Sequence, residues 1–303
     1  MPNRRLAVRL FLLSLTSMQE TAMPKNTAEY QYVTGQYRPS FTALFEHYQL
    51  ANDQVLRERT WDLEVRYGLH PRQTLDLCFA KGTAKANLVY LHAGYWQSRD
   101  KAQFRFIASA LSAHGYNVAL LNYPLCPDVS VDQIVASVSH GLLFSLTTLP
   151  ARDRQLPLML AGHSAGAHLT VELAMAQTAL APQQRPIAAI VPISGIYELA
   201  PLIETSLNDK LRLDMRHAQA CSPLARVSGD LVPAAFVVGG EETPAFLEQN
   251  RSMMEAWTQT GSPATCLEVA GRDHFTVLQE FEGPGGMLLE LIENLYQAVC
   301  PAS

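Results

Sequence analysis

A chain of 303 residues is long enough for one large α/β domain or for two small domains. Hydrophobic residues make up 48% and charged residues 17% of the sequence, which is typical of a globular protein. The net charge of −5 and the pI near 6.0 exclude a basic field for nucleic acid and favour a small organic molecule as partner. No run reaches the ~18–20 apolar residues of a membrane helix, so we expect no membrane partner.

The N-terminus allows two interpretations. Residues 1–22 have a basic start and an apolar stretch, as a signal peptide would, but Arg9 interrupts the stretch and no small-x-small cleavage site follows. Met23 offers a second start. We therefore interpret residues 1–29 as a disordered extension, with an early start codon favoured over a signal peptide, and residues 30–303 as a single domain.

From about Asp62 onward, short apolar runs alternate with amphipathic stretches of helical length, after an N-terminal helix over Phe41–Leu56. The runs that we predict as strands are Asp62–Tyr67, Thr74–Phe79, Ala86–His92, Val118–Asn122, Leu158–Gly162, Ala188–Ile193, Ala234–Val238 and Thr265–Val269. The stretches that we predict as helices are Ala102–His114, Val131–Leu146, Ala165–Ala179, Pro244–Thr260 and Met287–Val299. This pattern predicts an α/β fold with helices flanking a mostly parallel sheet.

One segment, Tyr197–Asp230, breaks the alternation. It is helical and loop-like, and it is too long for a tight connection. Insertions after the carboxyl end of a strand often cover the active site of an α/β protein. We predict that residues 197–230 form a small partial cap and not a separate domain.

The five cysteines are odd in number and far apart: Cys78, Cys126, Cys221, Cys266 and Cys300. None belongs to a C-x-x-C pair, and no Cys/His spacing matches a zinc site. We expect reduced, packed thiols, a cytoplasmic location, and neither a metal ion nor a cofactor.

The pentapeptide Gly162-His163-Ser164-Ala165-Gly166 has the pattern G-x-S-x-G. This pattern needs a strand, then a turn too tight for side chains on its flanks, then a helix. An apolar run precedes it and a helical segment follows, as required. The serine lies at the strained apex, and the helix N-terminus favours developing negative charge. We predict that Ser164 is a catalytic nucleophile; a turn without chemistry is the alternative.

A second motif, His92-Ala93-Gly94-Tyr95-Trp96, directly follows the strand that ends near residue 92. In hydrolases with this order of motifs, that loop supplies a backbone N–H to the oxyanion hole, together with the residue after the nucleophile. We therefore predict the amides of Gly94 or Tyr95, and of Ala165, as oxyanion donors. Trp96 and Phe275 are predicted to contact an aromatic leaving group, with ordinary core packing as the alternative.

The catalytic base should be a histidine on a loop after the last strand, and of the nine histidines only His274 meets this requirement. The acid should follow the strand that ends near residue 238, where Glu241 and Glu242 compete. Asp273 adjoins the histidine, and its side chain should diverge from the imidazole. We favour Glu242, which should place an oxygen within ~3.2 Å of Nδ1 of His274.

Together these motifs resemble the kynurenine formamidases of the hormone-sensitive-lipase-like branch of α/β-hydrolases. The resemblance also includes Asn122-Tyr123-Pro124-Leu125-Cys126-Pro127, Ser194-Gly195-Ile196-Tyr197 and Thr243-Pro244-Ala245-Phe246, and covers most of Tyr30 to Val299. There are two departures: Ala93 replaces the first glycine of the family's His-Gly-Gly-Tyr-Trp loop, and Glu242 stands where the family commonly has Asp. The alanine is tolerable only if its φ is not positive.

The resemblance implies an α/β-hydrolase fold and hydrolysis of N-formylkynurenine by a Ser164–Glu242–His274 triad without a metal. A carboxylesterase for short acyl esters is the second hypothesis, and a non-catalytic binding protein on a hydrolase scaffold is the third. We expect a small acyl amide or ester as partner, and we leave a homodimer open, because the sequence does not determine the oligomeric state.

Overall fold

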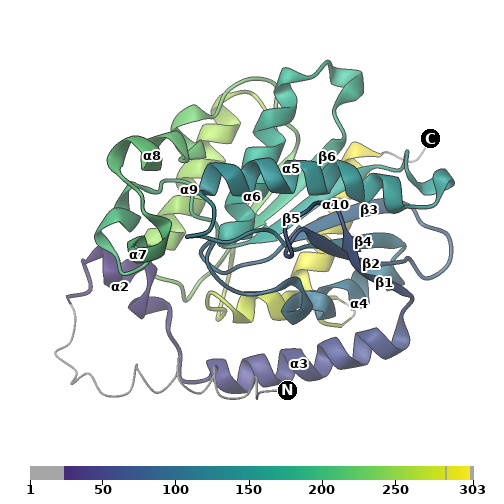
Figure 1. Cartoon of the computed structure of the whole chain (residues 1–303), viewed down its shortest axis with the longest axis horizontal. Helices are drawn as coiled ribbons and strands as arrows, with labels where there is room; N and C mark the ends of the chain where they lie inside the picture. The colour runs from purple at the N-terminus through teal and green to yellow at the C-terminus, as the bar shows by residue number, and fades with distance from the viewer. Residues whose placement is uncertain (1–23, 284, 301–303) are drawn as a thin grey trace.

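An eight-stranded sheet runs through the molecule in the order β1-β2-β4-β3-β5-β6-β7-β8 (Figure 1). The computed structural model describes residues 24–283 and 285–300, so the first 22 residues, with their two interpretations, lie outside it. The strands are β1 Trp61–Arg66, β2 Thr74–Cys78, β3 Ala86–Leu91, β4 Tyr116–Leu121, β5 Leu158–His163, β6 Ile187–Ile193, β7 Ala234–Gly239 and β8 Ala264–Val269. All eight predicted strands are present, with ends that differ by at most two residues.

The sheet is mostly parallel, as predicted. Strands β1 and β2 pair antiparallel with each other, and β2 pairs antiparallel with β4, whereas the pairs from β4 through β8 are parallel. The carboxyl ends of the parallel strands therefore meet at one edge of the sheet. In an open parallel sheet, that edge carries the ligand site.

Helices cover both faces of the sheet. The α-helices are α2 Ala28–Tyr32, α3 Phe41–Glu58, α4 Ala108–Ala113, α5 Val131–Thr148, α6 Ala165–Ala176, α7 Asn208–Leu211, α8 Met215–Ala220, α9 Pro244–Gln259 and α10 Met287–Val299. The 3₁₀ segments are η1 Thr34–Gln36, η2 Lys101–Ile107, η3 Ala151–Asp153, η4 Gln177–Ala179, η5 Pro182–Gln184, η6 Ala200–Glu204, η7 Pro223–Arg226 and η8 Thr276–Phe281. Helix α2 begins ahead of residue 30, where we predicted the folded domain to start.

Alternate residues of the central strands face two separate halves of the core. On β3, Val89 and Leu91 pack in the half that α5, α6 and α9 cover, whereas Leu88 and Tyr90 pack in the half that α3, α4 and α10 cover (Figure 1). Strands buried on both faces are expected to be continuously apolar, and β3 is fully buried. This is why the strands appear in the sequence as apolar runs without alternation.

The helix predicted over Ala102–His114 is two elements, the 3₁₀ segment η2 followed by α4. Phe104, Phe106 and Ile107 are all buried. Over so short a stretch, the spacing of apolar residues does not distinguish a 3₁₀ segment from an α-helix, so the division into two elements was not predicted.

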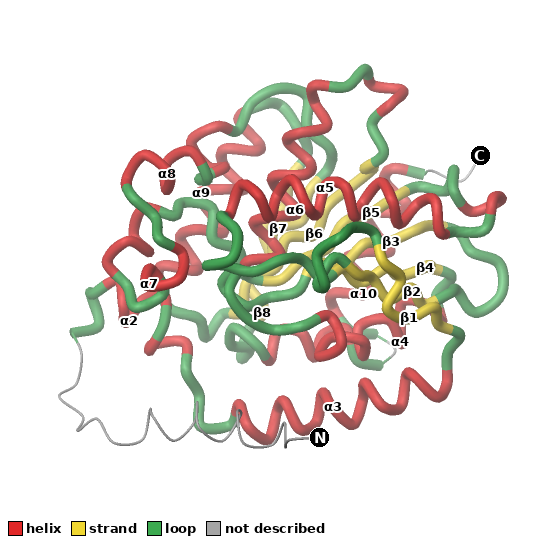
Figure 2. The backbone as a smooth tube through the Cα atoms, viewed as in Figure 1, coloured by secondary structure: helices red, strands yellow, loops and turns green. Residues whose placement is uncertain are grey.

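The segment that we predicted as a cap insertion consists of the short helical pieces η6, α7, α8 and η7 joined by loops. Figure 2 shows α7 of this insertion near α2, and the 3₁₀ segment η6 contacts α2, α7 and α8. None of the helices in the described ranges combines the length and the apolar character that a membrane span requires.

A buried charge cluster fixes the antiparallel end of the sheet. Asp76 of β2 is 0% exposed and accepts hydrogen bonds from Arg105 Nε at 2.7 Å and from the backbone N–H of Glu64 at 2.9 Å. The Lys101 ammonium, itself 1% exposed, lies 3.2 Å from the same carboxylate. The ammonium also pairs with Oε1 of Glu64 at 2.5 Å, but Glu64 is exposed, so Asp76 is the buried anion of the cluster.

We predict that Asp76→Ala lowers the free energy of unfolding by about 3 kcal/mol, because it removes the buried anion of the cluster and leaves the Lys101 ammonium only the exposed carboxylate of Glu64. Urea unfolding of the variant and the wild type measures this difference. Asp62→Ala is the matched control, since Asp62 is exposed on β1, and it should change the value by no more than about 0.5 kcal/mol. A loss at Asp76 as small as that of the control would contradict the role of the cluster.

Candidate active site

Ser164 occupies a strained turn between β5 and α6. Its φ of 57° and ψ of −118° lie outside the usual regions, and its N–H donates to the carbonyl of Ile193 at 2.8 Å. A Cβ on Gly162 would overlap the carbonyl oxygen of Gly166, and a Cβ on Gly166 would overlap that of Leu91. The turn therefore needs both flanking glycines, as the sequence pattern predicts.

Glu242 and His274 form a short buried hydrogen bond. Oε2 of Glu242 lies 2.6 Å from Nδ1 of His274, inside the predicted limit, and the two residues are 6% and 1% exposed. The other carboxylate oxygen accepts from the N–H of Gly239 at 2.9 Å and from Oγ of Ser194 at 2.5 Å. These donors hold the carboxylate in one orientation and stabilise its charge.

The two competing acids point elsewhere. The side chain of Glu241 is exposed, and its backbone carbonyl accepts a hydrogen bond from Arg38. Oδ1 of Asp273 accepts the backbone N–H groups of Phe275 and Thr276 at 3.0 Å and 2.9 Å, so this carboxylate caps its own loop. Of the three candidate acids, Glu242 is the one that contacts His274.

His163 joins the serine turn to the histidine loop. Its Nε2 donates to the backbone carbonyl of His274 at 2.6 Å, and the two rings are 4.7 Å apart between centroids. Burial, followed by the proximity of His274, holds the pKa of His163 well below its ordinary value, so this ring stays neutral. Nε2 of His274 is buried and has no hydrogen-bond partner among the described residues. That nitrogen is free to accept a proton.

The loop after β3 has three consecutive residues with positive φ: Gly94 at 134°, Tyr95 at 50° and Trp96 at 59°. A Cβ on Gly94 would overlap the carbonyl oxygen of Ser98, so glycine is required there. Ala93 is not among the residues with positive φ, so it meets the condition under which alanine is tolerable.

The predicted oxyanion donors lack other acceptors. Within residues 24–283 and 285–300, the backbone N–H groups of Gly94, Tyr95 and Ala165 make no hydrogen bond. The loop that carries the first two is fixed from behind, because Tyr123 Oη donates to the carbonyl of His92 at 2.7 Å. Burial lowers the pKa of His92 to about 4, so its ring is neutral.

The two predicted aromatic contacts have different surroundings. Trp96 is 0% exposed and meets the ring of His168 edge-on at 5.0 Å, as a core residue would. Phe275 is half-buried and packs edge-on against Phe41 at 4.9 Å and Phe45 at 5.1 Å. Phe275 therefore keeps an accessible surface, whereas Trp96 is enclosed.

Sequence reasoning missed several residues around the site. Ser194, at φ 51°, supplies the hydroxyl on Glu242. Tyr32 of α2 packs on Phe246 at 5.8 Å, Phe246 packs on His274 at 4.6 Å, and Tyr95 Oη donates to the carbonyl of Tyr32. Ser194 and Phe246 lie in segments of the family resemblance, but their contacts with Glu242 and His274 were not predicted. Ser194 directly follows β6, at the edge where such residues gather.

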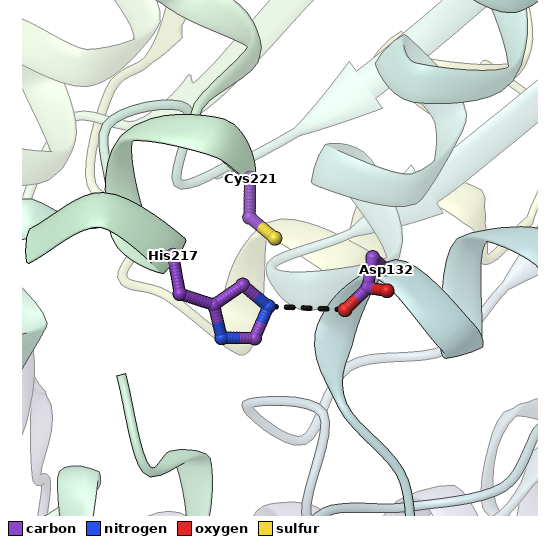
Figure 3. A group of neighbouring side chains, drawn as sticks. All are labelled: Asp132, His217 and Cys221. Carbon is purple, nitrogen blue, oxygen red and sulfur yellow. Dashed lines mark hydrogen bonds and ion pairs between the residues drawn. The ribbon is translucent and has the colours of Figure 1, made fainter. Parts of the chain in front are cut away.

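The cap insertion is tied to the body by polar contacts. Nε2 of His217 on α8 lies 3.0 Å from Asp132 on α5, and Cys221 lies beside this pair, with one ligand-type atom of each residue within 4.8 Å of the others (Figure 3). Burial raises the pKa of the Cys221 thiol to about 11, so it is protonated. The backbone carbonyl of Cys221 also contacts Nε2 of His168 at 2.8 Å. The cluster therefore fixes the cap over α5 and α6.

Known proteins are similar to this chain in sequence and in fold. The family model described as the alpha/beta hydrolase fold matches residues 88–278. A kynurenine formamidase from Drosophila melanogaster is 31% identical over 256 residues, which are 78% of this chain and 84% of that protein.

Two solved structures illustrate the fold. A Silicibacter protein, whose assignment as a thioesterase is provisional, superposes with a TM-score of 0.77 at 28% identity and covers 88% of this chain and 98% of its own. Esterase B from Lactobacillus rhamnosis superposes with a TM-score of 0.69 at 20% identity over 86% of this chain and 93% of its own. The chain therefore belongs to the α/β-hydrolase fold family and, within it, to the kynurenine formamidase family.

Proposed function

We propose that this hydrolase removes the formyl group of an aryl formamide, N-formylkynurenine, with Ser164 as nucleophile, His274 as base and Glu242 as the acid of the triad. The observation that carries the proposal is the buried Glu242–His274 hydrogen bond of 2.6 Å, which lies next to the strained serine turn. The Drosophila relative is named a kynurenine formamidase, which supports this choice of substrate. The five cysteines are free thiols, in keeping with the reducing cytoplasm that we propose as its location.

The reaction begins with attack of Ser164 Oγ on the formyl carbon, while Nε2 of His274 takes the hydroxyl proton. The Glu242 carboxylate holds Nδ1–H, so that Nε2 is the nitrogen without a proton. The tetrahedral intermediate collapses when His274 gives the proton to the leaving aryl amine. Water, activated by the same imidazole, then attacks the formyl ester and releases formate and Ser164.

The oxyanion of each tetrahedral intermediate is stabilised by the backbone N–H groups of Gly94 or Tyr95 and of Ala165. Their lack of acceptors among the described residues supports this role, because a free donor needs no rearrangement when charge develops. The N-terminus of α6 adds a favourable dipole. Losing one such donor would cost roughly 3–4 kcal/mol of transition-state stabilisation.

The burial of the site favours a small acyl group. Ser164 and His274 are each 1% exposed, and Phe246 packs directly on the imidazole. A formyl group is the smallest acyl group and needs little space beside the serine. The half-buried Phe275 can contact an aromatic leaving group, which makes it the better candidate for this contact than the enclosed Trp96.

We predict that Glu242→Gln lowers kcat by about 10³–10⁴-fold, because an amide in place of the carboxylate favours the wrong imidazole tautomer. Steady-state kinetics on the formamide and on an aryl acetate measure the effect. Glu241→Gln is the matched control and should keep wild-type kcat, since this side chain is exposed. Equal effects of the two substitutions on kcat would contradict the assignment of Glu242 as the acid.

We also predict hydrolysis of N-formylkynurenine and of aryl acetates, with kcat/KM falling steeply as the acyl chain lengthens. The burial of Ser164 limits the acyl side, and an ester is intrinsically easier to cleave than an amide. The measurement is kcat/KM across the formamide and the acetate, butyrate and hexanoate esters of one phenol. Efficient cleavage of butyrate or hexanoate with none of the formamide would reject the formamidase and leave a carboxylesterase.

A further inference from the structure

Arg99 carries a partly buried cation without a protein partner. Its guanidinium makes no hydrogen bond or ion pair within the described residues, and it lies over the rings of Phe45 at 4.1 Å and Phe275 at 5.5 Å. Burial lowers its pKa to about 10, so it is charged at neutral pH. The other described arginines that lack such partners are all exposed: Arg57, Arg66, Arg212 and Arg216.

The position of Arg99 is next to the proposed chemistry. A Cβ on Gly94, in the proposed oxyanion loop, would lie 3.0 Å from Cγ of Arg99. Phe275, which lies under the guanidinium, directly follows His274 in the chain. The positive charge is also close enough to His163 to contribute to the lowering of its pKa. The guanidinium therefore lies at the margin of the site.

The loop holds Arg99 in place and leaves its guanidinium free. Arg99 has φ 72°, and its carbonyl accepts a hydrogen bond from Arg72 Nη2 at 2.8 Å. The guanidinium of Arg72, by contrast, donates its hydrogen bonds to protein groups, and one of them is a 2.8 Å bond to the carbonyl of Tyr123. Arg72 therefore stabilises the loop, whereas the five N–H donors of Arg99 have no acceptor within the described residues.

We propose that Arg99 binds a carboxylate of the substrate, so that the enzyme selects aryl formamides with an anionic group on the leaving side. A carboxylate is the acceptor that matches the planar fork of a guanidinium, and the apolar rings of Phe45 and Phe275 reduce competition from water. The proposal rests on the proposed function, because the kynurenine part of N-formylkynurenine carries an α-carboxylate. The subsite lies on the leaving-group side, so it adds binding energy without enlarging the acyl space.

The test compares N-formylkynurenine with its methyl ester, in which an uncharged ester replaces the carboxylate, and it follows the release of formate so that cleavage of the methyl ester is not counted. In Arg99→Met, kcat/KM for the acid should fall about 10- to 100-fold, mainly through KM, because a hydrogen bond to a charged group is lost equally from the bound substrate and the transition state. The methyl ester should change by less than about twofold. Arg99→Lys should keep part of the preference, since it retains the charge and loses the fork.

Arg66→Met is the matched control, because Arg66 is an exposed arginine on β1 without a partner, and it should leave both substrates unaffected. An equal loss on both substrates in Arg99→Met, or no loss on either, would overturn the subsite. Urea unfolding of each variant separates a folding defect from a binding defect, and Arg99→Lys carries the test if Arg99→Met is unfolded.

A second substrate pair separates this proposal from the formamidase assignment. If the wild-type enzyme cleaves neither formamide, the proposed function fails. The effect of Arg99→Met is then measured on two esters, 3-acetoxybenzoate, which carries a carboxylate, and phenyl acetate, which does not. A loss confined to the carboxylated ester supports the subsite in an esterase, whereas an even loss rejects it. A wild-type enzyme that cleaves neither pair overturns both proposals.

Discussion

The hydrogen bond between Glu242 and His274 is the contact on which the arrangement of the site depends. It joins the loop after β7 to the loop after β8, and the N–H of Gly239 and the hydroxyl of Ser194 hold its acceptor side. A buried carboxyl group needs partners for its oxygens, and these three donors satisfy those of Glu242, which is 6% exposed. His163 then couples the imidazole loop to the serine turn through the 2.6 Å bond to the carbonyl of His274.

The parallel sheet makes this convergence possible, because loops from β3, β5, β6, β7 and β8 all leave the same edge. Helix α2 contacts η6 of the insertion and α9, which follows β7 at that edge. His217 ties the cap to Asp132, and Tyr32 of α2 reaches Phe246 beside the imidazole. Ser164 and His274 are each 1% exposed, and electrostatic interactions between groups that are shielded from water are stronger than those in solvent.

The features that could be predicted from the sequence are those with a local cause. Apolar runs mark strands buried on both faces, and the glycines around Ser164 mark a turn that admits no side chains. The position of His274 follows from the order of strands along the chain, because His274 lies on the loop after the last one. The choice between Glu241 and Glu242 remained open because neighbouring residues on an extended loop alternate in direction. The structure distinguishes them by burial and by the donors around Glu242.

Features that depend on distant contacts could not be predicted. The hydroxyl of Ser194 meets a residue 48 positions away, and Asp76 meets Arg105 across 29 positions. Both depend on the register of the sheet. The 3₁₀ form of η2 was also not predicted, because over seven residues the spacing of apolar side chains does not distinguish it from an α-helix. Arg99 gives no sequence signal, since a lone arginine is most often solvated.

The most direct test of the central claim is to label the native enzyme with a fluorophosphonate and to map the adduct by peptide mass. The account predicts a single adduct on Ser164, and slow or absent labelling in His274→Ala, because the hydroxyl then lacks its base. Circular dichroism checks that the wild-type enzyme and the His274→Ala variant are both folded. An unlabelled wild-type enzyme, or an adduct on another residue, would contradict the assignment of Ser164 as the nucleophile.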